Sequence, residues 1–211
     1  QALQYSTPEG FPQLRRQILH RECQNFVKPV ELSQIIITNG SQQGLDLAGK
    51  LFLDEGDVVL CESPTYLAAL QAFRSYGARF VEIPTDEEGI LIEELKKLLV
   101  RYPQTKMIYV IPNFQNPTGR TWSLARRQQF ISLLTEWEIP VVEDNPYGAL
   151  CFEGEVLPSL KEMDEKGFII QLGTFSKTYC PGYRIGWIIA SPELAQRFVA
   201  LKENTDLHTS S

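Results

Sequence analysis

A lysine lies among hydroxyl groups in the segment 173–184. Thr174 and Ser176 precede Lys177, and Arg184 follows it by seven residues. A lysine amine can form an imine with an aldehyde and, when desolvated, can act as a nucleophile or base. The two hydroxyls and the guanidinium could together bind a dianionic phosphate, because the arginine fork matches phosphate oxygens. The alternative is that Lys177 is a solvated loop lysine.

A second candidate group follows an apolar run in the sequence Glu-Asp-Asn-Pro-Tyr at 143–147. Asp144, at the end of a buried strand, could offer its carboxylate to a buried cation, which needs such a partner. Tyr147 could donate a hydrogen bond to an oxygen of the same ligand. The alternative is that Asp144 binds a metal ion or caps a helix.

Three further segments could complete a binding site. The Asn-Pro-Thr-Gly sequence at 116–119 is either an ordinary turn or one that aims the Asn116 amide into a cleft. Ser41 and Gln42 open a predicted helix, whose backbone amides bind phosphate unless Ser41 simply caps the helix. This segment matches neither a Walker A loop nor a dinucleotide GxGxxG motif. Tyr66, at another predicted helix start, could stack on a flat ring or lie in the core.

Short apolar runs alternate with amphipathic segments along the chain. The predicted strands are 35–38, 57–61, 79–83, 106–111, 139–143, 168–172 and 185–190. The predicted helices are 12–26, 41–53, 64–76, 91–101 and 123–137, with Pro12 as a first helical residue and Ser123 as an N-cap. This alternation predicts one α/β domain with a mostly parallel, seven-stranded sheet and helices on both faces. A loop with no clear helix precedes the last strand, which could therefore run antiparallel.

The candidate residues fall where such a fold binds ligands. Open α/β sheets bind them at the carboxyl ends of their strands. Polar segments follow the first, fourth, fifth and sixth predicted strands, beginning at Asn39, Pro112, Asp144 and Gly173. We therefore expect four loops to converge on one edge of the sheet.

Composition excludes several other classes of protein. The net charge of −6 argues against a nucleic-acid or acidic-membrane partner, since both need a basic surface. No apolar run approaches the roughly 20 residues of a membrane span, and no signal peptide opens the chain, so we expect a cytoplasmic protein. The four cysteines lack CxxC spacing and the two histidines are far apart, which argues against disulfides and a metal site.

Together these residues resemble the fold-type I enzymes that depend on pyridoxal 5′-phosphate (PLP), specifically the class I/II aminotransferases. The resemblance runs from "YSTPEGFPQLR" at 5–15 to "DLHTSS" at 206–211. Its specific marks are Lys177 with an arginine seven residues later, and the Asn-Pro-Thr-Gly sequence 28 residues before Asp144. The pair Tyr179-Cys180 departs from the leucine-alanine pair expected there, without affecting a catalytic position.

The resemblance implies a role for each candidate residue. Lys177 would bind PLP as a Schiff base and move a proton between the substrate Cα and the cofactor. Asp144 would pair with the pyridine nitrogen, and Tyr66 would stack on the ring. Tyr147 and Asn116 would hydrogen-bond the ring oxygen. The implied phosphate ligands are Ser41, Gln42, Thr174, Ser176 and Arg184.

The resemblance also implies a larger assembly. Tyr5 resembles the tyrosine that family members extend across a dimer interface to the partner's phosphate, so a homodimer is expected. The chain starts at Gln1 rather than Met, and we expect residues 1–211 to be the large domain of a longer protein. The absent small domain would carry the arginine that binds the substrate α-carboxylate. We therefore expect no transamination by this chain alone.

The sequences "VIPNFQNPTG", "EDNPYGALCFEG" and "LKENTDLHTSS" resemble the 2-aminoadipate and kynurenine aminotransferase branch. The implied reaction moves an amino group between an amino acid, such as 2-aminoadipate, kynurenine or another bulky one, and a 2-oxoacid. Two alternatives stay open. One is a PLP-binding sensor domain of a GntR-type transcription regulator, which would have a DNA-binding domain upstream. The other is a different fold-type I enzyme, such as a carbon–sulfur lyase.

Overall fold

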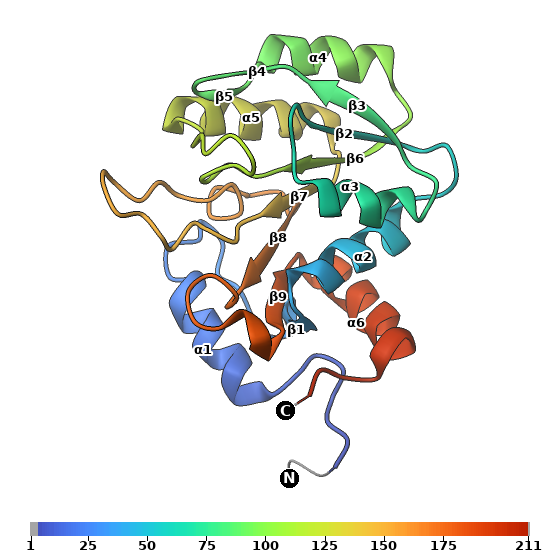
Figure 1. The fold of residues 1–211 in the computed structure, drawn as a ribbon, viewed down its shortest axis with the longest axis vertical. Helices are drawn as coiled ribbons and strands as arrows, with labels where there is room; N and C mark the ends of the chain where they lie inside the picture. The colour runs from blue at the N-terminus through green and yellow to red at the C-terminus, as the bar shows by residue number, and fades with distance from the viewer. Residues whose placement is uncertain (1–3, 211) are drawn as a thin grey trace.

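The computed structural model describes residues 4–210, in which seven strands form one sheet (Figure 1). The strands are β1 (Ile35–Asn39), β2 (Val58–Glu62), β3 (Arg79–Ile83), β6 (Thr105–Val110), β7 (Val141–Asp144), β8 (Ile169–Thr174) and β9 (Ile185–Ile189). Their order across the sheet is β1-β9-β8-β7-β6-β2-β3. Strand β9 is antiparallel to both neighbours, and the other pairs are parallel. The predicted sheet and its antiparallel last strand are confirmed, with ends that differ by at most two residues.

Helices cover both faces of this sheet, as predicted (Figure 1). They are α1 (Pro12–Glu22), α2 (Ser41–Phe52), α3 (Leu67–Arg74), α4 (Ile92–Arg101), α5 (Leu124–Trp137) and α6 (Pro192–Asp206). Helices α2, α3 and α6 pack on one face, where Ile36, Val59 and Ile170 point. Helices α1, α4 and α5 pack on the other, against residues such as Ile35, Val58 and Ile169. Most strands are buried on both sides, which explains their continuous apolar runs.

The predicted starts of α1, α2, α4 and α5 are confirmed to within one residue. Helix α3 instead begins at Leu67, three residues after its predicted start, and ends two residues early at Arg74. The end of α1 and one connector also differ. Pro12 is the first residue of α1, and Ser123 caps α5 by accepting a hydrogen bond from the Arg126 N–H at 3.2 Å. Helix α1 ends at Glu22, four residues before its predicted end, because a turn lets Phe26 pack against the core from outside the helix. The connector predicted at 84–89 contains a small hairpin, β4 (Thr85–Asp86) and β5 (Gly89–Ile90).

No helix within residues 4–210 is both long and apolar enough to cross a lipid bilayer. Strands β1, β6, β7 and β8 point the same way, so their carboxyl ends lie along one edge of the sheet. The loops that follow them are those in which the sequence placed its candidate residues.

Candidate active site

A cavity of about 330 Å³ opens at this edge of the sheet. Its lining consists of Ser41, Gln42, Tyr66, Ile111, Asn116, Asp144, Pro146, Tyr147, Thr174, Ser176, Lys177 and Arg184. Ten of the eleven predicted site residues are therefore brought together here. The eleventh, Tyr5, is not among the lining residues.

Hydroxyl and guanidinium groups cluster on one wall of the cavity. The Thr174 and Ser176 hydroxyl oxygens are 3.0 Å apart, and the Ser176 N–H donates to the Thr174 hydroxyl at 3.1 Å. Arg184 Nη1 lies 3.5 Å from the Ser176 hydroxyl and donates to the Pro181 carbonyl at 3.1 Å. This wall gathers donors and positive charge as a phosphate group requires.

The N-terminus of α2 completes that wall. The N-cap is Gly40, and no side-chain hydrogen bond caps the helix, so the capping alternative for Ser41 is wrong. A Cβ on Gly186 would lie 2.5 Å from the backbone nitrogen of Ser41. Glycine on β9 therefore allows the helix start to approach the sheet, where its free N–H groups and positive dipole end favour an anion.

Asp144 lines the same cavity from the last position of β7. Its Oδ2 accepts a hydrogen bond from the Tyr109 hydroxyl at 2.9 Å, while its Oδ1 is buried with no partner in the described structure. Burial raises the pKa of Asp144 to about 6, and the Tyr109 bond offsets part of this rise. A buried carboxylate oxygen without a partner is costly, so this atom suits a cationic or N–H ligand.

Neither alternative for Asp144 is supported. It ends a strand and accepts its one hydrogen bond from Tyr109, so it does not cap a helix. Across residues 4–210, no cluster of three or more His, Cys, Asp or Glu side chains could hold a metal ion.

Lys177 is an exposed residue of the cavity lining, with its Nζ 5.8 Å from the centre of the Tyr147 ring. Tyr66 is the N-cap residue of α3. It lines the cavity and also packs half-buried against the core, so the two roles that the sequence offered for it do not exclude each other. Burial, followed by the neighbouring Asp144 charge, raises the pKa of Tyr66. Its hydroxyl therefore stays protonated and its ring stays neutral at physiological pH.

Hydrogen bonds of the Gln115 side chain stabilise the turn that carries Asn116. Gln115 Nε2 donates to the Pro64 carbonyl at 2.7 Å, and Gln115 Oε1 accepts from the Thr118 N–H at 2.9 Å. The same glutamine therefore ties the Asn116 turn to the segment that leads into Tyr66. This arrangement favours the binding interpretation of the Asn-Pro-Thr-Gly sequence over an ordinary surface turn.

Sequence analysis did not identify Ile111 and Pro146 in the lining, nor Tyr109 behind it. Strand alternation contains a signal for two of them, because Tyr109 and Ile111 share one side chain direction along the run 106–111. Pro146 sits between two predicted residues, Asp144 and Tyr147, and carries no polar group to attract notice.

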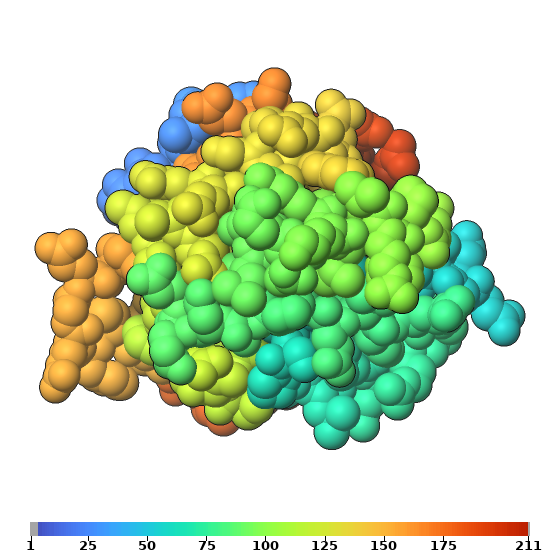
Figure 2. Space-filling model, turned by 90° about the horizontal axis from the view of Figure 1, so that it is seen from above, coloured from blue at the N-terminus to red at the C-terminus, as the bar shows by residue number. Residues whose placement is uncertain are grey.

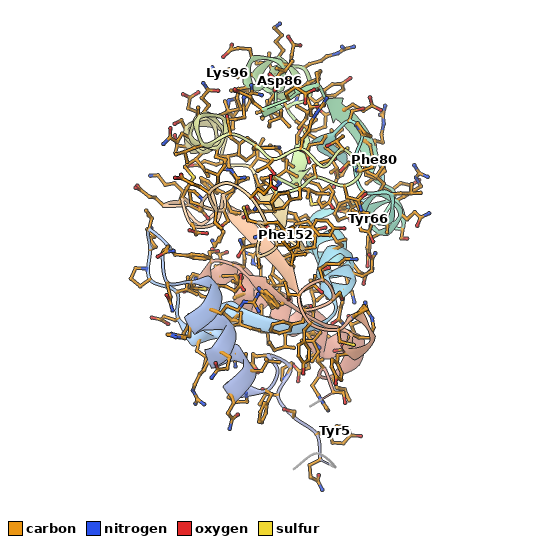
Figure 3. All side chains as sticks on the ribbon, turned by 60° about the vertical axis from the view of Figure 1, so that its left-hand side comes forward. Tyr5, Tyr66, Phe80, Asp86, Lys96 and Phe152 are labelled. Atoms are coloured by element: carbon orange, nitrogen blue, oxygen red, sulfur yellow. The ribbon has the colours of Figure 1, made fainter. Side chains whose placement is uncertain are left out.

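Tyr5 lies on the extended N-terminal segment, far from Tyr66 (Figure 3). Its side chain is 82% exposed, and its ring meets His208 edge-on at 5.9 Å between centroids. The structure of one chain thus leaves Tyr5 outside the cavity.

The sheet order, the helices on both faces and the lysine- and aspartate-lined cavity define an α/β domain of the fold-type I class. The chain belongs to the aminotransferase class I and II family, whose model matches residues 1–209.

Curated relatives match the whole chain but extend beyond it. The chain is 44% identical to aromatic-amino-acid aminotransferase 1 of Thermococcus litoralis, covering 100% of this chain and 52% of that protein. It is also 44% identical to 2-aminoadipate transaminase of Thermus thermophilus, covering 99% and 51%. An uncharacterized HTH-type transcriptional regulator of Bacillus subtilis is 37% identical, covering 99% and 43%. The chain therefore spans about half the length of the curated relatives that it matches.

Solved structures show the same fold. A crystal structure of Pyrococcus horikoshii kynurenine aminotransferase, described in complex with PMP, aligns with a TM-score of 0.93 at 42% identity. The alignment covers 99% of this chain and 52% of that one.

Proposed function

We propose that this chain is the PLP-binding large domain, over residues 1–211, of a longer aminotransferase. The observation that carries the proposal is the unpartnered, buried Oδ1 of Asp144 in the same cavity as Lys177 and the Arg184 phosphate-type wall. The carboxylate suits the ring nitrogen of PLP, the lysine amine suits its aldehyde, and the hydroxyl and guanidinium donors suit its phosphate.

Each end of the cofactor has protein groups to hold it. Ser41, Gln42, Thr174, Ser176 and Arg184 would bind the phosphate. The Asp144 carboxylate would pair with the ring nitrogen, and Tyr66 would lie against the ring face. Tyr147 and Asn116 would donate hydrogen bonds to the ring oxygen.

When bound, PLP supplies an aldehyde and an electron-withdrawing ring, which together weaken the Cα–H bond of an amino acid. The Lys177 amine would bind the aldehyde carbon in the resting protein and hold the mobile proton at Nζ when substrate displaces it. Asp144 would keep the ring nitrogen protonated, because a buried anion stabilises a neighbouring cation. Thr174, Ser176 and Arg184 would hold the cofactor by its phosphate, so that Lys177 and Asp144 would meet a ring in one orientation.

We propose an amino acid with a bulky side chain as donor and a 2-oxoacid as acceptor. The names of the relatives point to aromatic amino acids, 2-aminoadipate and kynurenine. A second hollow of about 530 Å³ shares Tyr147 with the cavity and is also lined by Phe114, Leu150, Phe152 and Glu153. Phe152 belongs to the segment that projects at the left of Figure 2, coloured orange, and Figure 3 labels its side chain. The apolar surface of this hollow, beside the cavity, supports the proposal that the substrate has a large side chain.

We further propose a cytoplasmic homodimer. Tyr5 is exposed and has no place in the cavity of its own chain, which supports a role at the cavity of a second copy. Light scattering that finds an active, full-length monomer would contradict this proposal.

A regulator's sensor domain is a second candidate, since the Bacillus subtilis relative matches 99% of the chain. A carbon–sulfur lyase is a third. The test is the absorbance of the full-length protein with PLP, before and after adding 2-aminoadipate, kynurenine or phenylalanine. An aminotransferase loses the aldehyde absorbance with an amino acid and regains it with a 2-oxoacid. A sensor shows no such cycle. A carbon–sulfur lyase is recognised in a separate reaction, in which an amino acid with a carbon–sulfur bond in its side chain is added and a thiol or sulfide is released.

A further inference from the structure

Tyr109 lies behind the cavity and forms a hydrogen bond with Asp144, which lines it. It lies near the end of β6, is fully buried, and is not itself a lining residue. Its hydroxyl donates to Asp144 Oδ2 at 2.9 Å. The ring of Phe73 on α3 packs edge-on against it, with 5.5 Å between ring centroids, so the phenol has a fixed position.

The contact makes the two oxygens of Asp144 unequal. Oδ2 faces Tyr109, whereas Oδ1 is buried without a partner in a residue that lines the cavity. A carboxylate held at one oxygen cannot rotate freely about its side-chain bond. The hydrogen bond therefore determines which oxygen is left for a ligand.

The charge of Asp144 depends on the same contact. Burial favours the neutral carboxyl group, and donation from Tyr109 favours the anion. Burial and the neighbouring Asp144 charge raise the pKa of Tyr109 well above its ordinary value, so Tyr109 remains a donor. Tyr109 therefore stabilises a buried carboxylate without competing with it for the negative charge.

We propose that Tyr109 is a positioning residue: it holds Asp144 as an anion with Oδ1 turned toward the nitrogen of a bound heteroaromatic ring. The inference rests on the proposed function, in which that ring is PLP. Tyr109 is not among the residues that line the cavity, so it would act on a bound ring through Asp144.

The test removes one oxygen atom. Tyr109→Phe keeps the ring against Phe73 and deletes the bond to Asp144. Tyr76→Phe is a matched control, because the Tyr76 hydroxyl donates to Asp46 Oδ1 at the same 2.9 Å but lies outside the cavity. Both variants are made in the full-length protein, and thermal unfolding without PLP shows whether each folds.

We expect Tyr109→Phe to raise the Kd for PLP and to lower kcat, each by about tenfold, since hydrogen bonds to charged groups have this magnitude. The KM for the amino acid should stay nearly unchanged, because Tyr109 does not contact the substrate. Tyr76→Phe should leave all three values at the wild-type level. Equal PLP affinity and kcat in the two variants would overturn the inference.

A double-mutant cycle separates positioning from a general structural effect. In an Asp144→Ala background, Tyr109→Phe should cause little further loss of PLP affinity, because the acceptor of its hydrogen bond is already gone. Full additivity of the two losses would mean that Tyr109 acts by another route, which also overturns the inference.

If Tyr109→Phe does not fold, 3-fluorotyrosine at position 109 keeps the shape and the hydroxyl but changes the strength of the donor. The pH midpoint of the absorbance of bound PLP should then shift, and an unchanged midpoint overturns the inference. Wild-type protein that binds no PLP would contradict the proposed function and this inference together. Wild-type binding with an unaffected Tyr109→Phe variant contradicts the inference alone.

Discussion

The guanidinium of Arg184 occupies the space that a side chain at Gly40 would fill. Gly40 caps α2 with a φ of 75°, and Arg184 itself has a φ of 53° after the turn at 181–183. The two backbones thus bring the arginine against the helix start. Any side chain at position 40 must displace the guanidinium, because the end of the flexible Arg184 side chain can move whereas the backbone at position 40 cannot.

Gly40→Ala should therefore reduce the binding free energy of PLP by more than it reduces the free energy of unfolding. Alanine at a positive φ costs about 1 kcal/mol of stability, and displacing Arg184 removes a charge from the phosphate wall. We expect a rise of about tenfold in the Kd for PLP, measured by fluorescence titration of the full-length protein. Gly56→Ala is the control, because Gly56 has a φ of 88° but nothing within 4 Å of a Cβ. Equal Kd values in the two variants would show that Arg184 has room to adapt.

Glu62 connects two of the loops that build the site. It is buried at the end of β2, where it accepts hydrogen bonds from the Ile111 N–H at 2.8 Å and from Trp122 Nε1 at 2.9 Å. Burial raises the pKa of Glu62 to about 7, against the lowering effect of these bonds. The folded state therefore binds a proton more tightly than the unfolded state does.

This difference predicts a pH dependence of stability. The contribution of the protonated Glu62 is fully present below its ordinary, unfolded pKa of about 4.5 and is lost as pH rises through the folded pKa of about 7. Glu62→Gln should lessen the fall in unfolding free energy across this window by up to about 1.4 kcal/mol per pH unit. Urea denaturation at pH 5 and pH 7.5 measures the change. The exposed Glu203→Gln variant should keep the wild-type slope, and an unchanged slope in Glu62→Gln would contradict the prediction.

The sequence could predict the sheet and most of the cavity because both depend on local patterns. The run of β2 is apolar from Val58 to Cys61. Strand β8 is buried along its whole length, and Lys177 follows it within a few residues. The contact between Tyr109 and Asp144 depends instead on the register of β6 against β7, where Val110 pairs with Glu143. A single sequence contains no direct signal for that register, so the partner of Asp144 could not be found. The contact of Glu62 with Trp122 spans 60 residues and was missed for the same reason.

Lys177 should be the residue that PLP modifies. It is the lysine that lines the cavity together with the phosphate-type donors, so an aldehyde anchored by those donors would lie close to its amine. Borohydride reduction of the PLP-loaded, full-length protein should attach the cofactor covalently, and peptide mapping should find it on the peptide that contains Lys177. Lys177→Ala should abolish the label, whereas Lys96→Ala on α4 should retain it. A label on another lysine would contradict the assignment.

Asp144 offers the sharpest test of the proposed chemistry, because its Oδ1 has no partner in the described structure. Asp144→Asn keeps the size of the side chain but removes the charge that holds the ring nitrogen protonated. The variant should still bind PLP through the phosphate wall and Lys177, so absorbance should show that cofactor is present. Transamination should nevertheless fall by a factor of 100 or more, on the order of the loss caused by removing a preorganised electrostatic partner.

Asp144→Glu is the matched comparison, because it keeps the charge and changes only the position of the carboxylate. It should lose less activity than Asp144→Asn, since a displaced anion still favours the protonated ring. Both variants are compared at equal PLP occupancy, determined by absorbance, in single-turnover reactions with an amino acid. Near wild-type rates for Asp144→Asn at full occupancy would mean that the ring nitrogen needs no anion here. The buried Oδ1 would then have to serve another ligand, and the orientation of the cofactor between Asp144 and Arg184 would have to be reversed or abandoned.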